Sequence, residues 1–229
     1  MPIDHALKER LTIVQARIGA AAYKVGREAS SIRLVLATKT QPSETIRAAW
    51  EAGARDFGEN YVQEAIAKRA ELVDLTDIRW HLIGHLQTNK ARTAASAFEL
   101  IHSVDSVRLA EALARAQPSS RVHALIEVNL GAETSKTGAA PDSVAAILDA
   151  AHDKIEVDGL MTIPPPARRP EDARPYFARL RELRDRLATQ SGYALSELSM
   201  GMTDDFEVAI EEGATIVRIG RAVFGERTA

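Results

Sequence analysis

The 229-residue chain lacks cysteine, is poor in aromatic residues and carries no excess of positive charge. Without cysteine it forms no disulfides, has no thiolate nucleophile and binds no metal through cysteine. A net charge of −3 and an aromatic content of 5% argue against a nucleic-acid-binding surface, which needs basic and stacking side chains. No run of about eighteen apolar residues occurs, so no membrane span is expected. The first residues also lack the features of a signal peptide, and a cytoplasmic protein is predicted.

Short apolar runs alternate with longer amphipathic segments, a pattern typical of βα units around a parallel sheet. Eight such strands predict one (β/α)₈ (TIM) barrel domain over residues 1–229, preceded by an extra helix within 4–29. A doubly wound open sheet is the alternative, although it normally has fewer strands. The expected strands are 33–38, 54–58, 80–84, 100–104, 122–129, 157–162, 197–200 and 215–220. The expected helices include 43–52, 61–73, 106–115, 142–152, 171–190 and 204–212.

Lys39 directly follows the first apolar strand. In parallel α/β folds, the carboxyl ends of the strands hold the chemistry. Desolvation at such a position lowers the pKa of a lysine and makes its amine a better nucleophile toward an aldehyde. The alternative is an ordinary solvated lysine just beyond a strand.

Two distant segments near the carboxyl terminus resemble a phosphate cradle. Residues 198–205 place small and hydroxyl side chains ahead of a helix, and residues 217–221 end an apolar run at Gly220. Loops after the seventh and eighth strands often form the phosphate site of a (β/α)₈ barrel. Gly201 and Gly220 are also compatible with simple turns. An unpaired buried Arg218 would be costly, so it is expected to face an anion.

A lysine and a phosphate cradle together suit an aldehyde that carries a phosphate, of which pyridoxal 5′-phosphate (PLP) is the commonest. The set of strand-end residues lacks the paired carboxylates of a glycosidase and the serine, histidine and acid of an acyl transferase. His81 and His85 are four residues apart, but a strand-to-loop passage does not align them for a metal. Asp204 and Asp205 are expected to cap the helix that follows.

The motifs also resemble those of the pyridoxal phosphate homeostasis proteins, single-domain relatives of the alanine racemase N-terminal barrel. The matching segments are ATKTQP (37–42), FGENYVQE (57–64), WHLIGHLQTNK (80–90), EVN (127–129), SKTG (135–138), GLM (159–161), LSMGMTDD (198–205), VRIG (217–220) and FG (224–225). The sequence departs from the usual pattern at Thr38, Gln41, Thr203 and Arg221. The two threonines keep the hydroxyl of a usual serine, whereas Arg221 adds charge where a small hydroxyl residue is usual.

The resemblance implies a fold-type III barrel that holds PLP as a Schiff base on Lys39. It implies that the phosphate and ring nitrogen are surrounded by Ser199, Thr203, Arg218, Gly220 and the amide of Arg221, with Asn60 nearby. It further implies no enzymatic activity, but a role in buffering the cofactor or delivering it to apo PLP-dependent enzymes, as a monomer or weak homodimer.

A PLP-dependent amino-acid racemase is the main alternative function. Racemisation needs acid–base groups on both faces of the substrate, and alanine racemases supply the second group, a tyrosine, from a C-terminal domain. The four tyrosines of this chain lie in or beside predicted helices, not at strand ends. A pure protein-interaction module has no positive support. Lys136 is either a secondary docking amine or an ordinary loop lysine.

Overall fold

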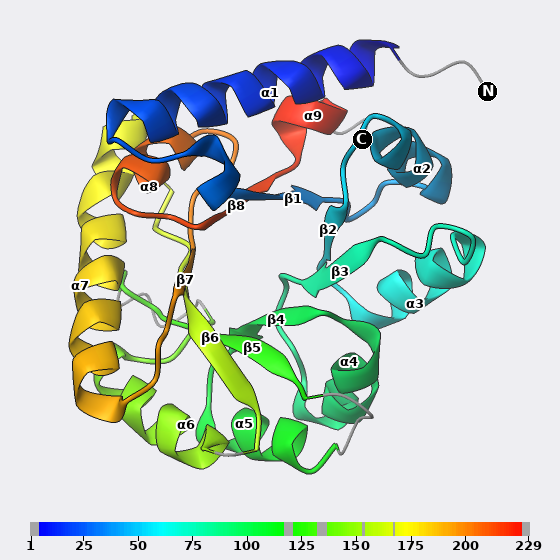
Figure 1. Ribbon diagram of the computed structural model, residues 1–229. Coiled ribbons are helices and arrows are strands. Elements are labelled where there is room, and N and C mark those ends of the chain that lie inside the picture. The colour runs from blue at the N-terminus through cyan, green and yellow to red at the C-terminus, as the bar shows by residue number, and fades with distance from the viewer. Residues whose placement is uncertain (1–4, 117–120, 132–136, 153, 167, 226–229) are drawn as a thin grey trace.

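Eight parallel strands close into a barrel in the order β1 to β8, surrounded by helices (Figure 1). The computed structural model describes residues 5–116, 121–131, 137–152, 154–166 and 168–225. The strands are β1 (Arg33–Ala37), β2 (Asp56–Glu59), β3 (Arg79–Leu82), β4 (Leu100–Val104), β5 (His123–Glu127), β6 (Glu156–Met161), β7 (Glu197–Ser199) and β8 (Ile216–Ile219). β8 pairs with β1 in the register Arg33↔Ile216 to Leu36↔Ile219, which closes the barrel. The predicted (β/α)₈ fold is therefore confirmed, and the open-sheet alternative is wrong.

The helices cover the outside of the barrel (Figure 1). They are α1 (His5–Lys24), α2 (Ser43–Glu51), α3 (Val62–Glu71), α4 (Ala91–Ala97), α5 (Val107–Ala114), α6 (Val144–Ala151), α7 (Arg174–Ser191), α8 (Phe206–Glu211) and α9 (Arg221–Phe224). The predictions omitted α4, whose alanines give weak apolar contrast, and the short α9. They also began α7 too early, because residues Pro170–Ala173 form a separate 3₁₀ turn.

The extra N-terminal helix α1 packs beside α8 and α9. Leu7, Leu11, Val14 and Ile18 recur at helical spacing and are buried. Arg10 on the same helix donates from Nε to the carbonyl oxygen of Val223 at 2.6 Å. α1 therefore ties the amino-terminal segment to the helices that follow β7 and β8.

The core has two parts. The larger one lies between the strands and the helices, whereas a small cluster of Val35, Leu100, Leu125, Met161 and Ile216 fills part of the barrel interior. Barrel interiors are normally packed with layers of branched apolar side chains. Here buried polar side chains occupy the rest of the interior, including His81, His102, Ser199 and Arg218.

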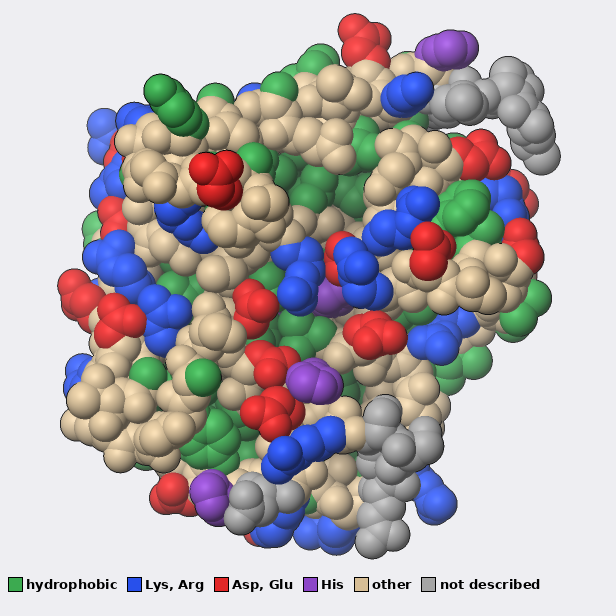
Figure 2. Space-filling model, in the orientation of Figure 1, with side chains coloured by type: hydrophobic (Ala, Val, Ile, Leu, Met, Phe, Trp, Pro, Cys, Tyr) green, Lys and Arg blue, Asp and Glu red, His purple; other side chains and the backbone are tan. Residues whose placement is uncertain are grey.

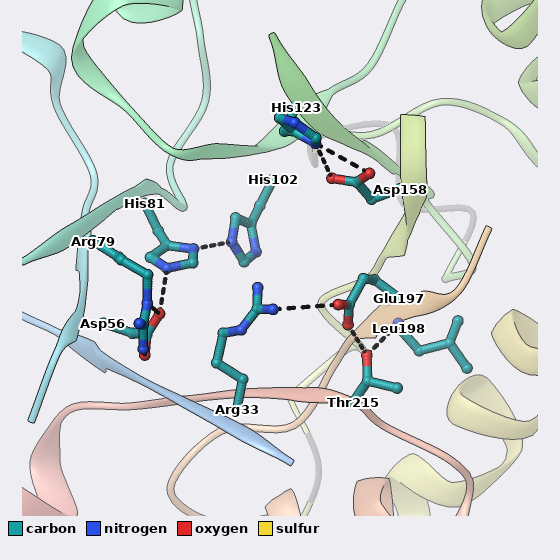
Figure 3. A network of polar contacts seen from close by, with 10 residues as sticks. All are labelled: Arg33, Asp56, Arg79, His81, His102, His123, Asp158, Glu197, Leu198 and Thr215. Carbon is teal, nitrogen blue, oxygen red and sulfur yellow. Dashed lines mark hydrogen bonds and ion pairs between the residues drawn. The ribbon is translucent and has the colours of Figure 1, made fainter. Parts of the chain in front are cut away.

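The mouth at the amino ends of the strands is strongly polar. It forms a hollow of about 360 Å³, and Figure 2 shows acidic, basic and histidine side chains gathered around the barrel axis on the face drawn. Asp56 accepts hydrogen bonds from Arg79 Nε at 2.8 Å and from His81 Nε2 at 3.0 Å (Figure 3). His123 pairs with Asp158 at 2.9 Å across β5 and β6.

We expect Asp56→Asn to lower the free energy of unfolding by about 2 kcal/mol at neutral pH, because charged hydrogen bonds are lost. Burial alone would raise the pKa of Asp56, but Arg79 and His81 outweigh it and hold that pKa well below its usual range. The stabilisation is therefore complete above about pH 4, the ordinary pKa of an unfolded aspartate, and is lost as the pH falls below it. Urea unfolding should show the difference between variant and wild type shrinking in acid.

Asp158→Asn is the matched control, because burial raises the pKa of Asp158 despite its contact with His123. A raised carboxyl pKa means that ionisation costs stability at neutral pH, so this variant should be no less stable than wild type there. A loss for Asp56→Asn of the same size at neutral and acidic pH would contradict the assigned role of its carboxylate.

Candidate functional site

Lys39 lies in the turn that follows β1, at the carboxyl-terminal mouth of the barrel. Its neighbour Thr40 adopts a left-handed backbone conformation with φ of 66°, which is unfavourable for a β-branched residue. The amide of Thr40 donates to Glu64 Oε1 at 2.9 Å. The strained turn is therefore fixed from α3, and it presents the half-buried Lys39 at the mouth.

A second lysine holds the strand end just before Lys39. Lys68 Nζ donates to the carbonyl oxygen of Thr38 at 2.9 Å, to Glu59 Oε1 at 2.7 Å and to Glu64 Oε1 at 2.6 Å. Burial raises the pKa of Glu59, although Lys68 opposes this shift. Burial would also raise the pKa of Glu64, but hydrogen bonds from Lys68 and the Thr40 amide outweigh it and lower that pKa. This network anchors the backbone on both sides of Lys39.

Arg218 is a nearly inaccessible guanidinium on β8, only 4% exposed. It donates from Nη1 to Ser199 Oγ at 2.5 Å and from Nη2 to the carbonyl oxygen of Thr162 at 3.0 Å. Burial lowers the pKa of Arg218 to about 10. Both of these acceptors are neutral, so a buried positive charge lies at the site with no contacting carboxylate among the residues that the structure describes. Such a charge favours an anionic or strongly accepting ligand.

Lys39 and Arg218 line the same pocket, which has a volume of about 190 Å³. Its other walls come from the strand ends and turns after β1, β7 and β8, and they include Ala37, Gln41, Thr203, Gly220, Arg221 and Phe224. A side chain at position 220 would place its Cβ 3.2 Å from the carbonyl oxygen of Ala37, so glycine keeps this wall open. Larger hollows of about 530 and 860 Å³ exist, but no lysine is found among the described residues that line them.

Glycine at position 201 lets the turn after β7 pack closely against α8. Gly201 has φ of 93°, and a Cβ there would lie 2.6 Å from the Cβ of Ala209. Thr203 Oγ1 accepts from the amide of Ala222 at 3.4 Å, which links this turn to α9. Arg221 forms an ion pair with Asp204. The expected phosphate cradle is therefore a contiguous surface made by two segments that are distant in sequence.

The structure brings together most of the residues that the sequence singled out. Lys39, Thr203, Arg218, Gly220 and Arg221 line the pocket. The remaining two do not. Ser199 is fully buried and contacts Arg218 from β7, and Asn60 follows β2, where its backbone packs against Gly84.

Three other predictions have mixed outcomes. Asp205 does occupy the N-cap position of α8, but its carboxylate accepts from the amide of Met202 at 2.7 Å and not from the helix. The predicted capping by Asp204 is wrong, since Asp204 pairs with Arg221. Lys136 lies outside the described residues.

His81 and His85 point to different surroundings. His81 is buried against His102, whereas His85 lies 3.3 Å from Asp105. Within the described part of the chain, no group of three or more histidine, aspartate or glutamate residues could hold a metal ion.

The sequence reasoning missed the anchoring network around Lys68. One signal was available, because Glu64 and Lys68 are four residues apart on a predicted helix and this spacing favours an ion pair. Nothing in the local pattern indicated that the pair would reach Glu59 and the carbonyl of Thr38.

Comparison with known proteins decides the family. The profile described as "Alanine racemase, N-terminal domain" matches residues 17–228. A pyridoxal phosphate homeostasis protein of Aquifex aeolicus is 47% identical over 96% of this chain and 97% of its own length. The chain belongs to the pyridoxal phosphate homeostasis protein family. A relative with the same name in Pseudomonas aeruginosa is 43% identical, with 96% of each chain covered.

Solved structures agree with this assignment. PipY of Synechococcus elongatus, in a structure with PLP bound, superposes with a TM-score of 0.85 at 38% identity, covering 96% of this chain and 100% of PipY. The structure of PipY without PLP gives a TM-score of 0.86 at 39% identity. An alanine racemase of Corynebacterium glutamicum shares the fold, with a TM-score of 0.69 at 17% identity, and this chain covers 61% of it.

Proposed function

We propose that this protein binds PLP as a Schiff base on Lys39 and acts as a non-catalytic carrier that buffers or delivers the cofactor inside the cell. One observation carries the proposal, namely that Lys39 and the buried Arg218 line one pocket. The binding of PLP by PipY, a relative with the same fold, supports it.

The residues of the pocket fit the chemistry of this ligand. The amine of Lys39 would form a C=N bond to the aldehyde carbon with loss of water. Thr203, Gly220 and the backbone amide of Arg221 would meet the phosphate, and Arg218 supplies a buried donor for an accepting atom. Ser199 supports Arg218, and Asn60 lies at the neighbouring strand end. When bound, PLP contributes an aldehyde and a ring that accepts electrons.

The surroundings of the pocket support binding without catalysis. Racemisation needs a second acid–base group opposite the lysine. Tyr61 is 67% exposed beside α3, and Tyr23 is 85% exposed on α1. Tyr193 donates to the carbonyl oxygen of Leu148, and Tyr176 is on α7, so no tyrosine lines the pocket. The relatives are named homeostasis proteins, and these names also support a non-catalytic role.

The proposal also covers the setting of the protein. We propose one domain over the whole chain, a cytoplasmic location, apo PLP-dependent enzymes as recipients, and a monomer or weak homodimer. None of the described helices combines the length and apolarity needed to cross a membrane.

Cofactor transfer separates a carrier from an enzyme. The PLP-loaded protein should restore activity to an apo PLP-dependent enzyme while losing its own visible absorbance. Incubated with alanine in deuterium oxide, it should incorporate no deuterium at the α-carbon beyond the rate with free PLP. Rapid deuteration with inversion would establish a racemase and refute the carrier function.

A further inference from the structure

A continuous line of hydrogen-bonded side chains crosses the barrel interior. It begins at Arg218, whose Nη1 is 2.5 Å from Ser199 Oγ, and Ser199 Oγ is 2.9 Å from His102 Nδ1. His102 Nε2 is then 3.0 Å from His81 Nδ1, and His81 Nε2 is 3.0 Å from Asp56 Oδ1 (Figure 3). This relay connects the pocket of Lys39 with the opposite, amino-terminal mouth.

The two ends of the relay fix its direction. Arg218 can only donate, and the ionised Asp56 can only accept. When each imidazole carries a single proton, His81 donates to Asp56 and accepts from His102, and His102 in turn accepts from Ser199. Ser199 then accepts from Arg218 and donates its own proton to His102. For two neutral imidazoles, only one arrangement of protons satisfies all four contacts, and it places the proton of each ring on Nε2.

The surroundings reinforce this arrangement. His81 is 1% exposed and His102 is fully inaccessible, and burial lowers the pKa of each. At the far end Arg79 clamps Asp56 through two hydrogen bonds, of 2.8 and 2.6 Å, so the acceptor end is held in place. The relay thus has a fixed anchor at each end of the barrel.

We propose that Asp56, His81 and His102 are positioning residues for the pocket, because the relay directs the Ser199 hydroxyl proton away from it and holds Arg218 in one orientation. Ser199 then serves a ligand by orienting Arg218 and not by donating its proton to a phosphate. The consequence for PLP rests on the proposed function, but the relay itself does not.

Histidine ¹⁵N NMR of the ligand-free protein tests the relay directly. His81 and His102 should show the neutral Nε2–H tautomer and keep it across about pH 5 to 8, where accessible histidines titrate. Signals are assigned with His81→Gln and His102→Gln, and His123, which lies at the same mouth outside the relay, is the control. A Nδ1–H tautomer or a doubly protonated ring at His81 or His102 would overturn the proposal.

Two substitutions at one position test the positioning effect. Asn at position 102 keeps an acceptor near that of Nδ1, whereas Leu removes it. His102→Leu should weaken PLP binding roughly tenfold, because Ser199 loses the hydrogen bond that orients it toward Arg218. His102→Asn should stay within about twofold of the wild-type affinity. His123→Leu should match wild type. Circular dichroism and melting curves establish that each variant is folded.

The outcomes separate this inference from the proposed function. Equal affinities for the Leu and Asn variants, or a changed tautomer, would refute the positioning role even if PLP binds to Lys39. If PLP does not bind at all, the proposed function fails, and the NMR result alone still decides whether the relay exists.

Discussion

Lys39→Ala should abolish the visible absorbance of the PLP-loaded protein and weaken retention of the cofactor at least about 100-fold, or roughly 2.7 kcal/mol. The reason is chemical, because the pocket loses its amine and can no longer form the C=N bond. The surrounding turn should remain, since Lys68 and Glu64 hold Thr38 and Thr40 on either side of position 39. Titration with PLP, followed by absorbance and by dialysis, measures both effects.

Two further variants make this test specific. Lys39→Arg keeps a positive charge but has no competent amine, so it should lose the absorbance while retaining more affinity than Lys39→Ala. Lys8→Ala, on the exposed face of α1, should behave as wild type. Full absorbance in Lys39→Ala would mean that another lysine carries the cofactor.

Arg218→Met should have the second largest effect, lowering PLP affinity without lowering the stability of the fold. PLP affinity should fall about 100-fold, because a buried charged donor to the ligand is lost. Stability should not fall, because in the described part of the chain the guanidinium hydrogen-bonds only to the neutral oxygens of Ser199 and Thr162. Such a charge is costly to bury, and an apolar residue of similar length removes that cost. Isothermal titration and urea unfolding of the same preparation measure the two quantities.

Arg27→Met is the matched control for this variant. Arg27 also donates to neutral carbonyl oxygens, those of Ile210 and Ala214 at 3.2 and 2.8 Å, and burial also lowers its pKa. It does not line the pocket of Lys39, so its replacement should leave PLP affinity unchanged and, by the same reasoning, should not lower stability. If Arg218→Met binds PLP as tightly as wild type, the buried guanidinium has no part in the site.

The sequence was sufficient to predict the barrel, because each strand is a short apolar run between amphipathic segments. Lys39 and Arg218 could be found in the same way, since one follows and the other interrupts such a run. A charged side chain buried there is costly unless it has a partner or a ligand. The helix α4 was missed because alanine contributes little to the contrast between faces.

The relay could not be predicted, because its contacts join residues far apart in the chain. His81 and His102 are 21 residues apart, and His102 and Ser199 are 97 apart. Their meeting depends on the barrel closing with these side chains directed inward. Periodicity shows which residues share a face of one strand, but not which inward side chains of different strands come into contact.

Borohydride reduction of the PLP-loaded wild-type protein, followed by peptide mapping, identifies the residue that holds the cofactor. Reduction converts the C=N bond into a stable C–N bond and leaves the cofactor on the residue that held it. We expect a single modified peptide, with the pyridoxyl phosphate group on Lys39. Modification of a different lysine, or none after saturation with PLP, would contradict it.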